Sequence, residues 1–350
     1  MTAHLRVIAP GLMTTVQDLG RPGYQRLGVP PSGPLDHVSM RAANLLVGNP
    51  PATAVLEIAY AGPTLAVAAN SVRLALAGAA ADIELLPATG EAHTLPMRAS
   101  ARLRAGDRLR IGALTGGAVA YLAIEGGLAL PSVMGSRATF TRAAIGGLAG
   151  RALRAGDLIP LGQAAVPARG ELALDAPAPT RTRPARVRVV LGPQEDYFTA
   201  RGLRTLLSAT YTITPASDRM GMRLAGPPLE HSDKGCNIVS DGIATGAIQV
   251  PGDGLPIVLL VDRQTTGGYP KIATVISADI PAIGGMTPGE EITFAAVDVT
   301  AAEAAARQLA GEIAELPRWL IRRAPGLDAA ALMRENLVSG MVDARDAGAG

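Results

Sequence analysis

The stretch VDRQTTGGYPKIATV, residues 261–275, groups side chains that could polarise a small carbonyl compound. Lys271 or Arg263 could stabilise charge developing on an oxygen atom, and Tyr269 could donate or relay a proton. Asp262 could orient either cation or act as a base. The adjacent glycines would allow a tight turn or a close backbone approach to a ligand. The alternative is a salt-bridged hairpin that binds no ligand.

Lysine is rare in this chain. Lys234 and Lys271 are the only lysines among 32 basic residues, and the other 30 are arginines. Because the planar guanidinium fork does not replace a compact ammonium with three donors, a lysine kept against this bias is a candidate for ammonium chemistry. Chance codon usage explains either lysine alone equally well.

A polar loop is expected at residues 16–36, where glycines and prolines surround Gln17, Asp18, Arg21 and Asp36. Loops held on a rigid scaffold are where binding residues concentrate. The alternative is a structural turn in which Asp36 only caps the following helix.

Two later stretches are also polar. In SDRMGMRLAG, residues 217–226, Arg219 could bind a carboxylate or phosphate, or could form an ion pair with a nearby acid. SDGIATGAIQVP, residues 240–251, carries Gln249 and leads toward the 261–275 stretch. A further polar stretch is RAANLLVGN, residues 41–49, with Glu57 on the next strand. Asn44 could face the polar loop, but a plain helix-to-strand packing role is favoured.

The motifs of several common enzyme classes are missing. The four histidines are far apart and Cys236 is the single cysteine, so neither a zinc site nor an internal disulfide is expected. G-x-S-x-G, the phosphate-binding G-x-x-x-x-G-K-[ST] and the dinucleotide fingerprint do not occur. We therefore expect no metal, and we expect catalysis to use scattered polar groups or to be completed by another chain.

The elements that must position these residues are mostly short strands bounded by Gly, Pro and Asp. Two of them, 256–260 and 272–278, are predicted to form a hairpin-like pair around the polar turn. Helices are predicted at 37–47 after the N-cap Asp36, at 196–207, and at 301–316 with a Thr300–Glu303 capping box. Other expected strands are 5–8, 54–61, 72–78 and 119–127.

The chain divides into two strand-rich halves. At 350 residues it exceeds the ~250 at which single cores usually stop growing, so two domains are expected. The halves share a weak echo in which Asp, Arg and Gly lie close together, as a duplicated β-domain would show. The predicted division is 1–162, a Pro-rich linker at 163–186, 187–299, and a C-terminal helix and tail at 300–350, with helical apolar spacing at 327–342.

Composition indicates a soluble, cytoplasmic protein. The net charge is +2 and the basic residues are scattered, so the footprint of a nucleic-acid binder is missing. No apolar run approaches the ~20 residues of a membrane span, and no secretory signal is visible at the start. A lone cysteine is typical of a reducing compartment.

Seven segments, in order from about residue 5 to about residue 295, resemble the biotin-dependent carboxyltransferase / allophanate hydrolase subunit 2 family. They are QDLGRPGYQRLGVPPSGPLD, ANLLVGN, AVLEIAYAGPTL, GSRATF, SDRMGMRLAG, SDGIATGAIQVPGDGLPIVLLVDRQTTGGYPKIATV and PGEEITF. The family includes the C subunit of a bacterial 5-oxoprolinase and is similar to part of urea carboxylase. The resemblance implies a mainly β (α+β) fold with two tandem cyclophilin-like β-barrel domains.

The resemblance also implies partners and a cofactor. A protein like the B subunit of 5-oxoprolinase would build the active unit with this chain, and a protein like its A subunit would support hydrolysis. The reaction would be the ATP-dependent opening of 5-oxoproline to glutamate, with ATP shared with the partner. The substrate would be a small amide or lactam.

Two other activities stay open. Urea carboxylase-like relatives would transfer a carboxyl group from carboxybiotin to an amide nitrogen, but this chain has no biotin-accepting lysine in a Met-Lys-Met context. Biotin would have to come from another polypeptide. The family also includes an antagonist of a sporulation-kinase inhibitor, which would make the chain a binding module.

Family motifs map onto the polar stretches residue by residue. The implied catalytic positions are Asp262, Arg263, Tyr269 and Lys271. The implied substrate-binding positions are Gln17, Asp18, Arg21, Asp36, Arg219, Met220, Gln249, Gln264, Thr265 and Gly268. One departure, IPAIGGMTPGE at 280–290, would change a wall of the pocket.

Overall fold

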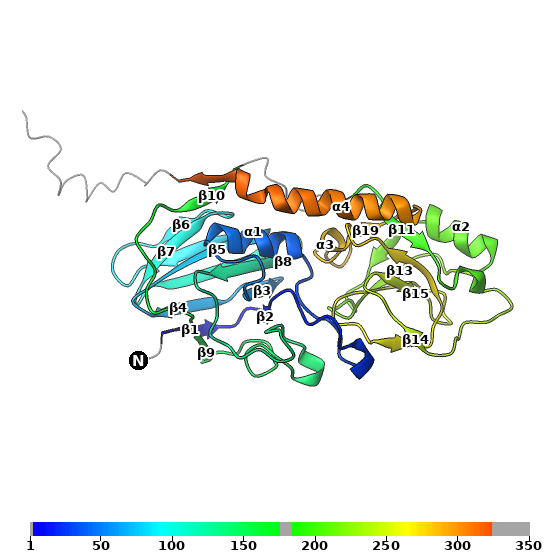
Figure 1. Cartoon of the computed structure of the whole chain (residues 1–350), viewed down its shortest axis with the longest axis horizontal. Helices are drawn as coiled ribbons and strands as arrows, with labels where there is room; N and C mark the ends of the chain where they lie inside the picture. The colour runs from blue at the N-terminus through cyan, green and yellow to red at the C-terminus, as the bar shows by residue number, and fades with distance from the viewer. Residues whose placement is uncertain (1–2, 176–183, 324–350) are drawn as a thin grey trace, which may run out of the picture.

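Two curled sheets lie side by side, and helix α4 (Val299–Glu315) runs along one side of both (Figure 1). The computed structural model describes residues 3–175 and 184–323. The expected class, mainly β with two barrel-like sheets and a C-terminal helix, is confirmed. In these described ranges, no helix is long and apolar enough to cross a bilayer.

The first sheet has nine strands between residues 4 and 160. Alternation along β1 buries Leu5 and Val7, as the period of two in a strand requires. The long strands β5 and β8 pair with two register shifts, which bend a sheet and increase its twist. Its strands are β1 (His4–Ala9), β2 (Met13–Gln17), β3 (Val55–Ala59), β4 (Thr64–Ala68), β5 (Ser71–Leu86), β6 (His93–Leu95), β7 (Ser100–Arg104), β8 (Arg108–Ile124) and β9 (Leu158–Pro160).

Helix α1 (His37–Leu46) packs on β5 and β8. As predicted, Asp36 is its N-cap, accepting hydrogen bonds from the backbone N–H of Val38 at 3.0 Å and of Ser39 at 3.1 Å. Gly48 follows the helix with φ 77°, a conformation that glycine adopts without strain. The cap fixes where the preceding polar loop joins the helix.

The second sheet has eight strands in the order β19-β12-β13-β16-β15-β18-β11-β20. Strand β15 lies between β16 and β18, so the predicted hairpin-like pairing of these two strands is wrong: the chain between them crosses β15. Its strands are β11 (Val187–Leu191), β12 (Tyr211–Ile213), β13 (Gly221–Ala225), β15 (Ala247–Gln249), β16 (Ile257–Leu259), β18 (Lys271–Val275), β19 (Glu291–Ile292) and β20 (Phe294–Ala296).

The crossing segment carries a strand of its own, β17 (Thr266–Gly267), which pairs with β14 (Asp241–Gly242). This two-residue ladder fastens the 240–246 loop over the polar turn. Loop and turn therefore meet at one edge of the second sheet, where β14 is labelled in Figure 1.

The predicted helix boundaries need two corrections. Helix α2 (Ala200–Ser208) begins later than predicted, because its N-cap is Thr199. The N-cap of α4 is Asp298, whose Oδ1 accepts from the backbone N–H of Ala301 at 2.7 Å, so the proposed Thr300–Glu303 capping box is wrong. The remaining short helices are α3 (Ile280–Ile283) and the 3-10 turns η1 (Gln25–Leu27), η2 (Thr141–Ala143), η3 (Glu195–Tyr197) and η4 (Leu316–Trp319).

The segment predicted as a linker contains a strand. Within it, β10 (Leu172–Leu174) pairs antiparallel with β21 (Leu320–Arg322), which follows α4. The chain therefore returns from the second sheet to the first half through α4 (Figure 1). The domain boundaries stay a prediction, and the helical spacing at 327–342 lies outside the described residues.

Two large apolar clusters stabilise these layers. One fills the interior of the first sheet and includes Leu56, Leu65 and Leu122. The other includes Met40 of α1 together with second-sheet residues such as Phe294. Because one cluster joins both halves, burying it stabilises their relative placement as well as each sheet, at roughly 1.5–3 kcal/mol for each large side chain removed from water.

Candidate functional site

Lys271 begins β18 and its side chain is buried. Its Nζ donates to Asp241 Oδ2 at 2.9 Å and lies 3.4 Å from Gly242 O. Gln194 supports it through two further hydrogen bonds: Oε1 accepts from Lys271 N–H, and Gln194 N–H donates to Lys271 O, both at 3.1 Å. The ammonium is therefore held by a carboxylate and a backbone carbonyl of the β14 segment.

Two glutamines line the same turn. Gln249, at the end of β15, accepts from Gln264 Nε2 at 3.1 Å and donates its own Nε2 to Tyr269 O at 3.3 Å. Thr265 O accepts from Ile243 N–H at 3.0 Å. The sequence-predicted residues Gln249, Gln264 and Thr265 are thus brought together with Lys271 by the crossing segment. Among the four positions implied to be catalytic, Tyr269 is exposed to solvent and the other three are buried.

Arg263 is a buried cation held by carbonyl groups. Its Nε donates to Ile243 O at 3.0 Å and its Nη1 to Leu260 O at 3.3 Å. Neither partner carries charge, and burial lowers the pKa of Arg263 to about 10. A desolvated guanidinium without a carboxylate partner among the described residues favours an incoming anion or oxyanion.

The adjacent glycines have different roles. A Cβ on Gly267 would lie 2.5 Å from Gln249 Nε2 and 2.8 Å from Ile243 Cδ1, so this glycine lets the turn pack against Gln249. At Gly268 the nearest atom would be Ile238 O at 3.6 Å, an ordinary contact distance. The close approach expected from the sequence is therefore made by the protein's own side chains at Gly267, and a ligand contact of Gly268 stays a prediction.

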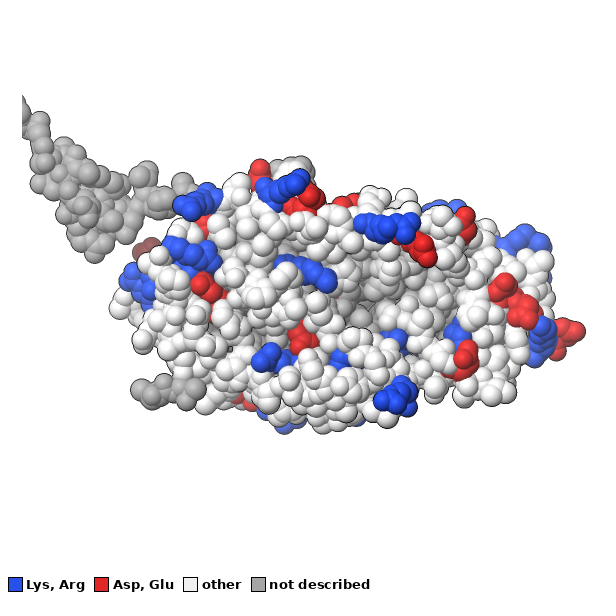
Figure 2. All heavy atoms as spheres, viewed as in Figure 1, with Lys and Arg blue, Asp and Glu red and all other residues white. Residues whose placement is uncertain are grey.

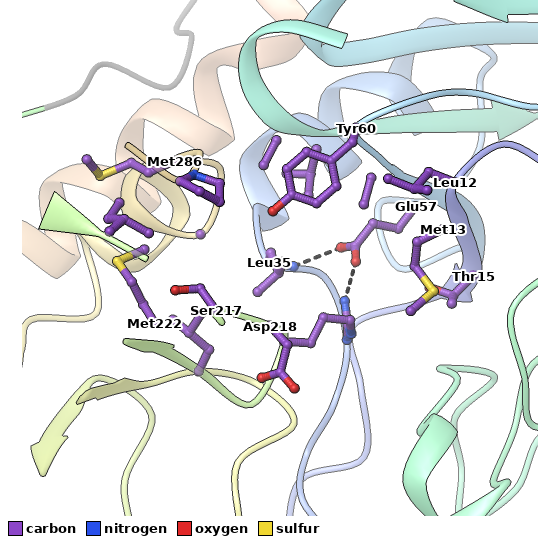
Figure 3. A pocket seen from close by; sticks show the side chains of 18 residues that line it. Leu12, Met13, Thr15, Leu35, Glu57, Tyr60, Ser217, Asp218, Met222 and Met286 are labelled. Carbon is purple, nitrogen blue, oxygen red and sulfur yellow. Dashed lines mark hydrogen bonds and ion pairs between the residues drawn. The ribbon is translucent and has the colours of Figure 1, made fainter. Parts of the chain in front are cut away.

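Asp262 belongs to a different cluster. Its Oδ2 accepts from Arg219 Nε at 2.7 Å, and Arg219 also pairs with Glu57 of the first sheet (Figure 3). Glu57 Oε2 in turn accepts from Leu35 N–H at 2.9 Å and from Tyr121 Oη at 2.8 Å. The network joins the two halves. Because Asp262 bonds Arg219, it is not a partner of Arg263 or Lys271.

Charge compensation dominates this network. Burial alone would lower the pKa of Arg219, but the carboxylates of Asp262 and Glu57 outweigh it and raise that pKa above its ordinary value. The pKa of Tyr121 is raised by burial and by its proximity to Glu57 and Asp36, so the phenol stays protonated and donates to Glu57. Arg219 is therefore a charged group whose hydrogen bonds are made within the protein.

A pocket of ≈ 320 Å³ lies against this network, between the two halves. Figure 2 shows the surface hollowed between the halves, below α4, with positive and negative side chains interspersed on this face. The walls are mostly apolar, and in Figure 3 Met222 and Met286 lie on one side of the pocket and Met13 on the opposite side. They include Leu12, Met13, Leu35, Glu57, Tyr60, Ala118, Ile213, Asp218, Arg219, Met222, Leu260 and Met286.

The polar loop of the first half is bound to residues 133–139. Asp18 accepts from Ser136 Oγ and Arg137 N–H, and Gln17 Nε2 donates to Thr139 O at 3.1 Å. Arg21 donates to the carbonyl of Ala138. These contacts position the loop, and the predicted substrate contacts of Gln17, Asp18, Arg21 and Asp36 stay predictions. Met220 is placed with the Arg219 cluster, where its N–H donates to Asp218 Oδ1 at 2.8 Å.

Sequence reasoning missed the partners that complete both clusters. Asp241 and Gln194 hold Lys271, and Tyr121 holds Glu57, to which the sequence had assigned no role. One signal was present: Glu57 is a charged residue inside an apolar strand, and such a residue needs a buried partner. Within the described residues no group of His, Cys, Asp and Glu is arranged to hold a metal ion.

The chain thus combines two curled sheets with two buried polar clusters, one at Lys271 and one at Arg219. The family described as "Carboxyltransferase domain, subdomain A and B" matches residues 27–296, and the chain belongs to that family. The resemblance seen in the sequence motifs is confirmed.

Individual relatives are of two kinds. The chain is 36% identical to the C subunit of the Escherichia coli 5-oxoprolinase over 294 residues, covering 83% of this chain and 90% of that protein. It is 32% identical to urea amidolyase of Saccharomyces cerevisiae, covering 83% of this chain but 16% of that protein. The solved urea amidolyase of K. lactis superposes with a TM-score of 0.81 at 30% identity, over 90% of this chain and 20% of that one. The chain thus spans about a fifth of that solved protein.

Proposed function

We propose that this chain is the C-type component of an ATP-dependent 5-oxoprolinase, which opens the lactam of 5-oxoproline to give glutamate. The observation that carries this proposal is the 36% identity that extends over 90% of the C subunit of a 5-oxoprolinase. The urea amidolyase relatives share a similar identity over 16% of their length, as one part of a larger enzyme. The proposal implies that the chain works in the cytoplasm as one of several different chains of an enzyme.

The donors around Lys271 are the groups proposed to act on the lactam. The Lys271 ammonium and the Arg263 guanidinium are buried cations at the same turn. Arg263 is suited to polarise the lactam carbonyl and stabilise a developing oxyanion, and Lys271 to bind and orient the substrate. The Tyr269 hydroxyl, on the exposed side, would relay a proton. Asp262 is bound to Arg219 across the interface, so its proposed role is to position Arg219 and not to act as a base.

ATP is assigned mainly to the partner chains. The described residues offer neither a glycine-rich phosphate loop nor a group of carboxylates arranged for a metal ion. ATP would supply phosphoryl activation of the lactam oxygen, and this chain would bind and orient the lactam. A B-like partner would complete the site, and an A-like partner would support hydrolysis.

A second candidate is carboxyl transfer to urea or a related amide. It is favoured by the superposition on urea amidolyase, a TM-score of 0.81 over 90% of this chain. Biotin would then be carried by another polypeptide, and the substrate would be a neutral amide. A purely regulatory binding module would need neither reaction.

Reconstitution separates these functions. The chain is purified with its cognate A-like and B-like partners, and ATP consumption and glutamate release are followed with 5-oxoproline, with urea plus a carboxylated biotin carrier as the parallel assay. We expect glutamate release that requires all three chains. Carboxylation of urea without glutamate release would establish the second candidate, and a folded complex inactive in both assays would leave only a binding module.

A further inference from the structure

The partner of Lys271 is unusual for a buried cation. The Lys271 side chain is 3% exposed, whereas that of Asp241 is 55% exposed. The hydrogen bond from Lys271 lowers the pKa of Asp241, so this group is a carboxylate at neutral pH. A buried ammonium thus has a counter-ion that remains open to solvent, and a dissolved anion could reach the place of that counter-ion.

Asp241 is attached to the sheet by few bonds. Strand β14 contributes two residue pairs with β17, Asp241 with Gly267 and Gly242 with Thr266. Beyond Lys271, the side chain that bonds Asp241 is Gln194, whose Nε2 lies at 3.4 Å, a long contact. The other carboxylate oxygen, Asp241 Oδ1, accepts from the backbone N–H of the adjacent Gly242 at 2.7 Å. Replacing Asp241 Oδ2 on Lys271 would therefore break the Lys271 bond and the long Gln194 contact and leave the Gly242 bond in place.

The two buried cations at this turn, Lys271 and Arg263, share one bonded carboxylate among the described residues. The consecutive carbonyls of Gly242 and Ile243 contact Lys271 Nζ at 3.4 Å and Arg263 Nε at 3.0 Å, so both cations are anchored on one short segment. Among the described residues, Asp241 is the single carboxylate bonded to either cation. A second negative charge is electrostatically favourable here.

We propose that Lys271 is the recognition site for a carboxylate on the substrate, and that Asp241 occupies its place in the free protein. The inference rests on the proposed function, and it names the substrate class more narrowly: a lactam that bears a carboxylate, as 5-oxoproline does, and not a neutral amide such as urea. On binding, the substrate carboxylate replaces Asp241 as the acceptor of the Lys271 ammonium. Arg263 adds a positive field at the same turn.

The two lysines make a direct test possible. Protein labelled with ¹³Cε-lysine gives two lysine signals, and the Lys234→Arg variant assigns them. The labelled chain is titrated with 5-oxoproline, with 2-pyrrolidone, which is the same lactam without the carboxylate, and with urea. The titration is run on the chain alone and in complex with its unlabelled A-like and B-like partners.

We expect 5-oxoproline to move the Lys271 signal with saturation and to leave the Lys234 signal in place, while 2-pyrrolidone and urea move neither. Asp241→Asn removes the competing charge at constant shape, so it should lower the Kd for 5-oxoproline at least about fivefold. Asp253→Asn is the matched control: it removes the same charge from an exposed aspartate whose contact is the backbone N–H of Leu255 at 3.0 Å, and it should leave the Kd unchanged.

The proposal is wrong if the Lys271 signal is unmoved by 5-oxoproline both in the free chain and in the complex. It is also wrong if 2-pyrrolidone moves the signal equally, or if Asp241→Asn weakens binding. These readouts do not depend on turnover. If the complex releases glutamate but the Lys271 signal stays fixed, the proposed function stands and this inference fails. If the Lys271 signal responds to 5-oxoproline but the complex releases no glutamate, this inference stands and the proposed function fails.

Discussion

At the scale of single residues, His37 shows how burial changes ionisation in this fold. It is the first residue of α1, and its Nδ1 lies 2.8 Å from Arg41 Nη1. Burial, together with the neighbouring Arg41 charge, lowers the pKa of His37 to about 4. A helix N-terminus also disfavours positive charge. The native protein therefore keeps His37 neutral where an unfolded chain would protonate it.

This neutral histidine predicts a pH dependence of stability. The folded pKa lies below the unfolded value of about 6.5, so between these values the unfolded state binds more protons. The free energy of unfolding should fall as the pH drops from about 7 to about 4, by up to about 3 kcal/mol from this group. Urea denaturation at several pH values measures it. His37→Gln should flatten the profile in this window, whereas the exposed His93→Gln should not.

Residue identities predicted the Lys271 turn but not its partners. The bias against lysine, two glycines and the polar run were visible in the sequence, and Lys271, Gln249, Gln264 and Thr265 do meet. The carboxylate on Lys271 comes from Asp241, and the carboxylate of Asp262, next to Arg263 in sequence, turns to Arg219. Which acid meets which cation depends on strand order, which local spacing does not encode.

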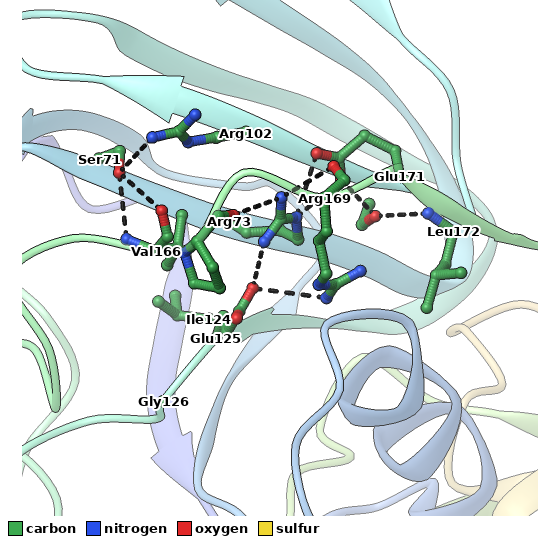
Figure 4. A network of polar contacts seen from close by, with 12 residues as sticks. Ser71, Arg73, Arg102, Ile124, Glu125, Gly126, Val166, Arg169, Glu171 and Leu172 are labelled. Atoms are coloured by element: carbon green, nitrogen blue, oxygen red, sulfur yellow. Dashed lines mark hydrogen bonds and ion pairs between the residues drawn. The ribbon is translucent and has the colours of Figure 1, made fainter. Parts of the chain in front are cut away.

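At the scale of elements, the segment before β10 is fastened by one arginine (Figure 4). Arg73 of β5 is fully buried and pairs with Glu125 at 2.5 Å and with Glu171 at 3.0 Å. It also donates to the carbonyls of Pro167 and Arg169. Since β10 pairs with β21, this cluster connects the first sheet to the end of the α4 return.

Arg73→Met should release this segment. Glu171 would lose its cation and Glu125 would keep only the longer pair with Arg169 at 3.4 Å, at a cost of about 3 kcal/mol in the free energy of unfolding. Urea denaturation measures the loss, and limited trypsin digestion should show faster cleavage at Arg169. Arg110→Met, which removes an exposed ion pair with Glu84 at 3.1 Å, should change stability by less than about 1 kcal/mol. Equal effects of the two substitutions would contradict the fastening role.

Local signals predicted some elements well. The Asp36 cap and Gly48 correctly bounded α1, since a helix terminus is determined by a few adjacent residues. The α4 cap was misassigned because Thr300 and Asp298 are both good caps, and the side chain of Asp298 is the one that bonds the helix N–H groups. The β16–β18 hairpin was wrong because insertion of β15 is a long-range choice.

At the scale of the whole molecule, Arg219 joins the two halves. It bonds Glu57 from the first sheet and Asp262 from the second, and its Nη2 donates to Gly33 O at 2.6 Å. Arg219→Met would leave two buried carboxylates without a cation, and it should cost about 3–5 kcal/mol of unfolding free energy. Adding Glu57→Gln and Asp262→Asn should recover part of that loss. A triple variant no more stable than Arg219→Met would contradict the assignment.

Length and strand content predicted two strand-rich halves, and the structure has two sheets, but the shared core was not predicted. Met40 of α1 and Phe294 of β20 belong to one apolar cluster although they are far apart in sequence. The pocket between the halves is likewise lined by residues of both, such as Tyr60 and Met286. No contiguous sequence motif therefore predicts this pocket. The sequence predicted functional residues at the 261–275 turn. The second polar cluster, around Arg219, is visible only in the structure.

The most direct test of the central claim, that Lys271 acts on the substrate of a 5-oxoprolinase-type complex, is the turnover of the reconstituted complex with Lys271→Met. Met fills the buried position, and Asp241 stays solvated, so the melting temperature should change little. The kcat/KM for glutamate release should fall at least about 100-fold, because the substrate carboxylate would lose the charged partner that binds and orients it. Lys234→Met, which removes the exposed pair with Asp196, is the matched control and should keep full activity. A Lys271→Met complex that assembles and turns over like the wild type would contradict the account.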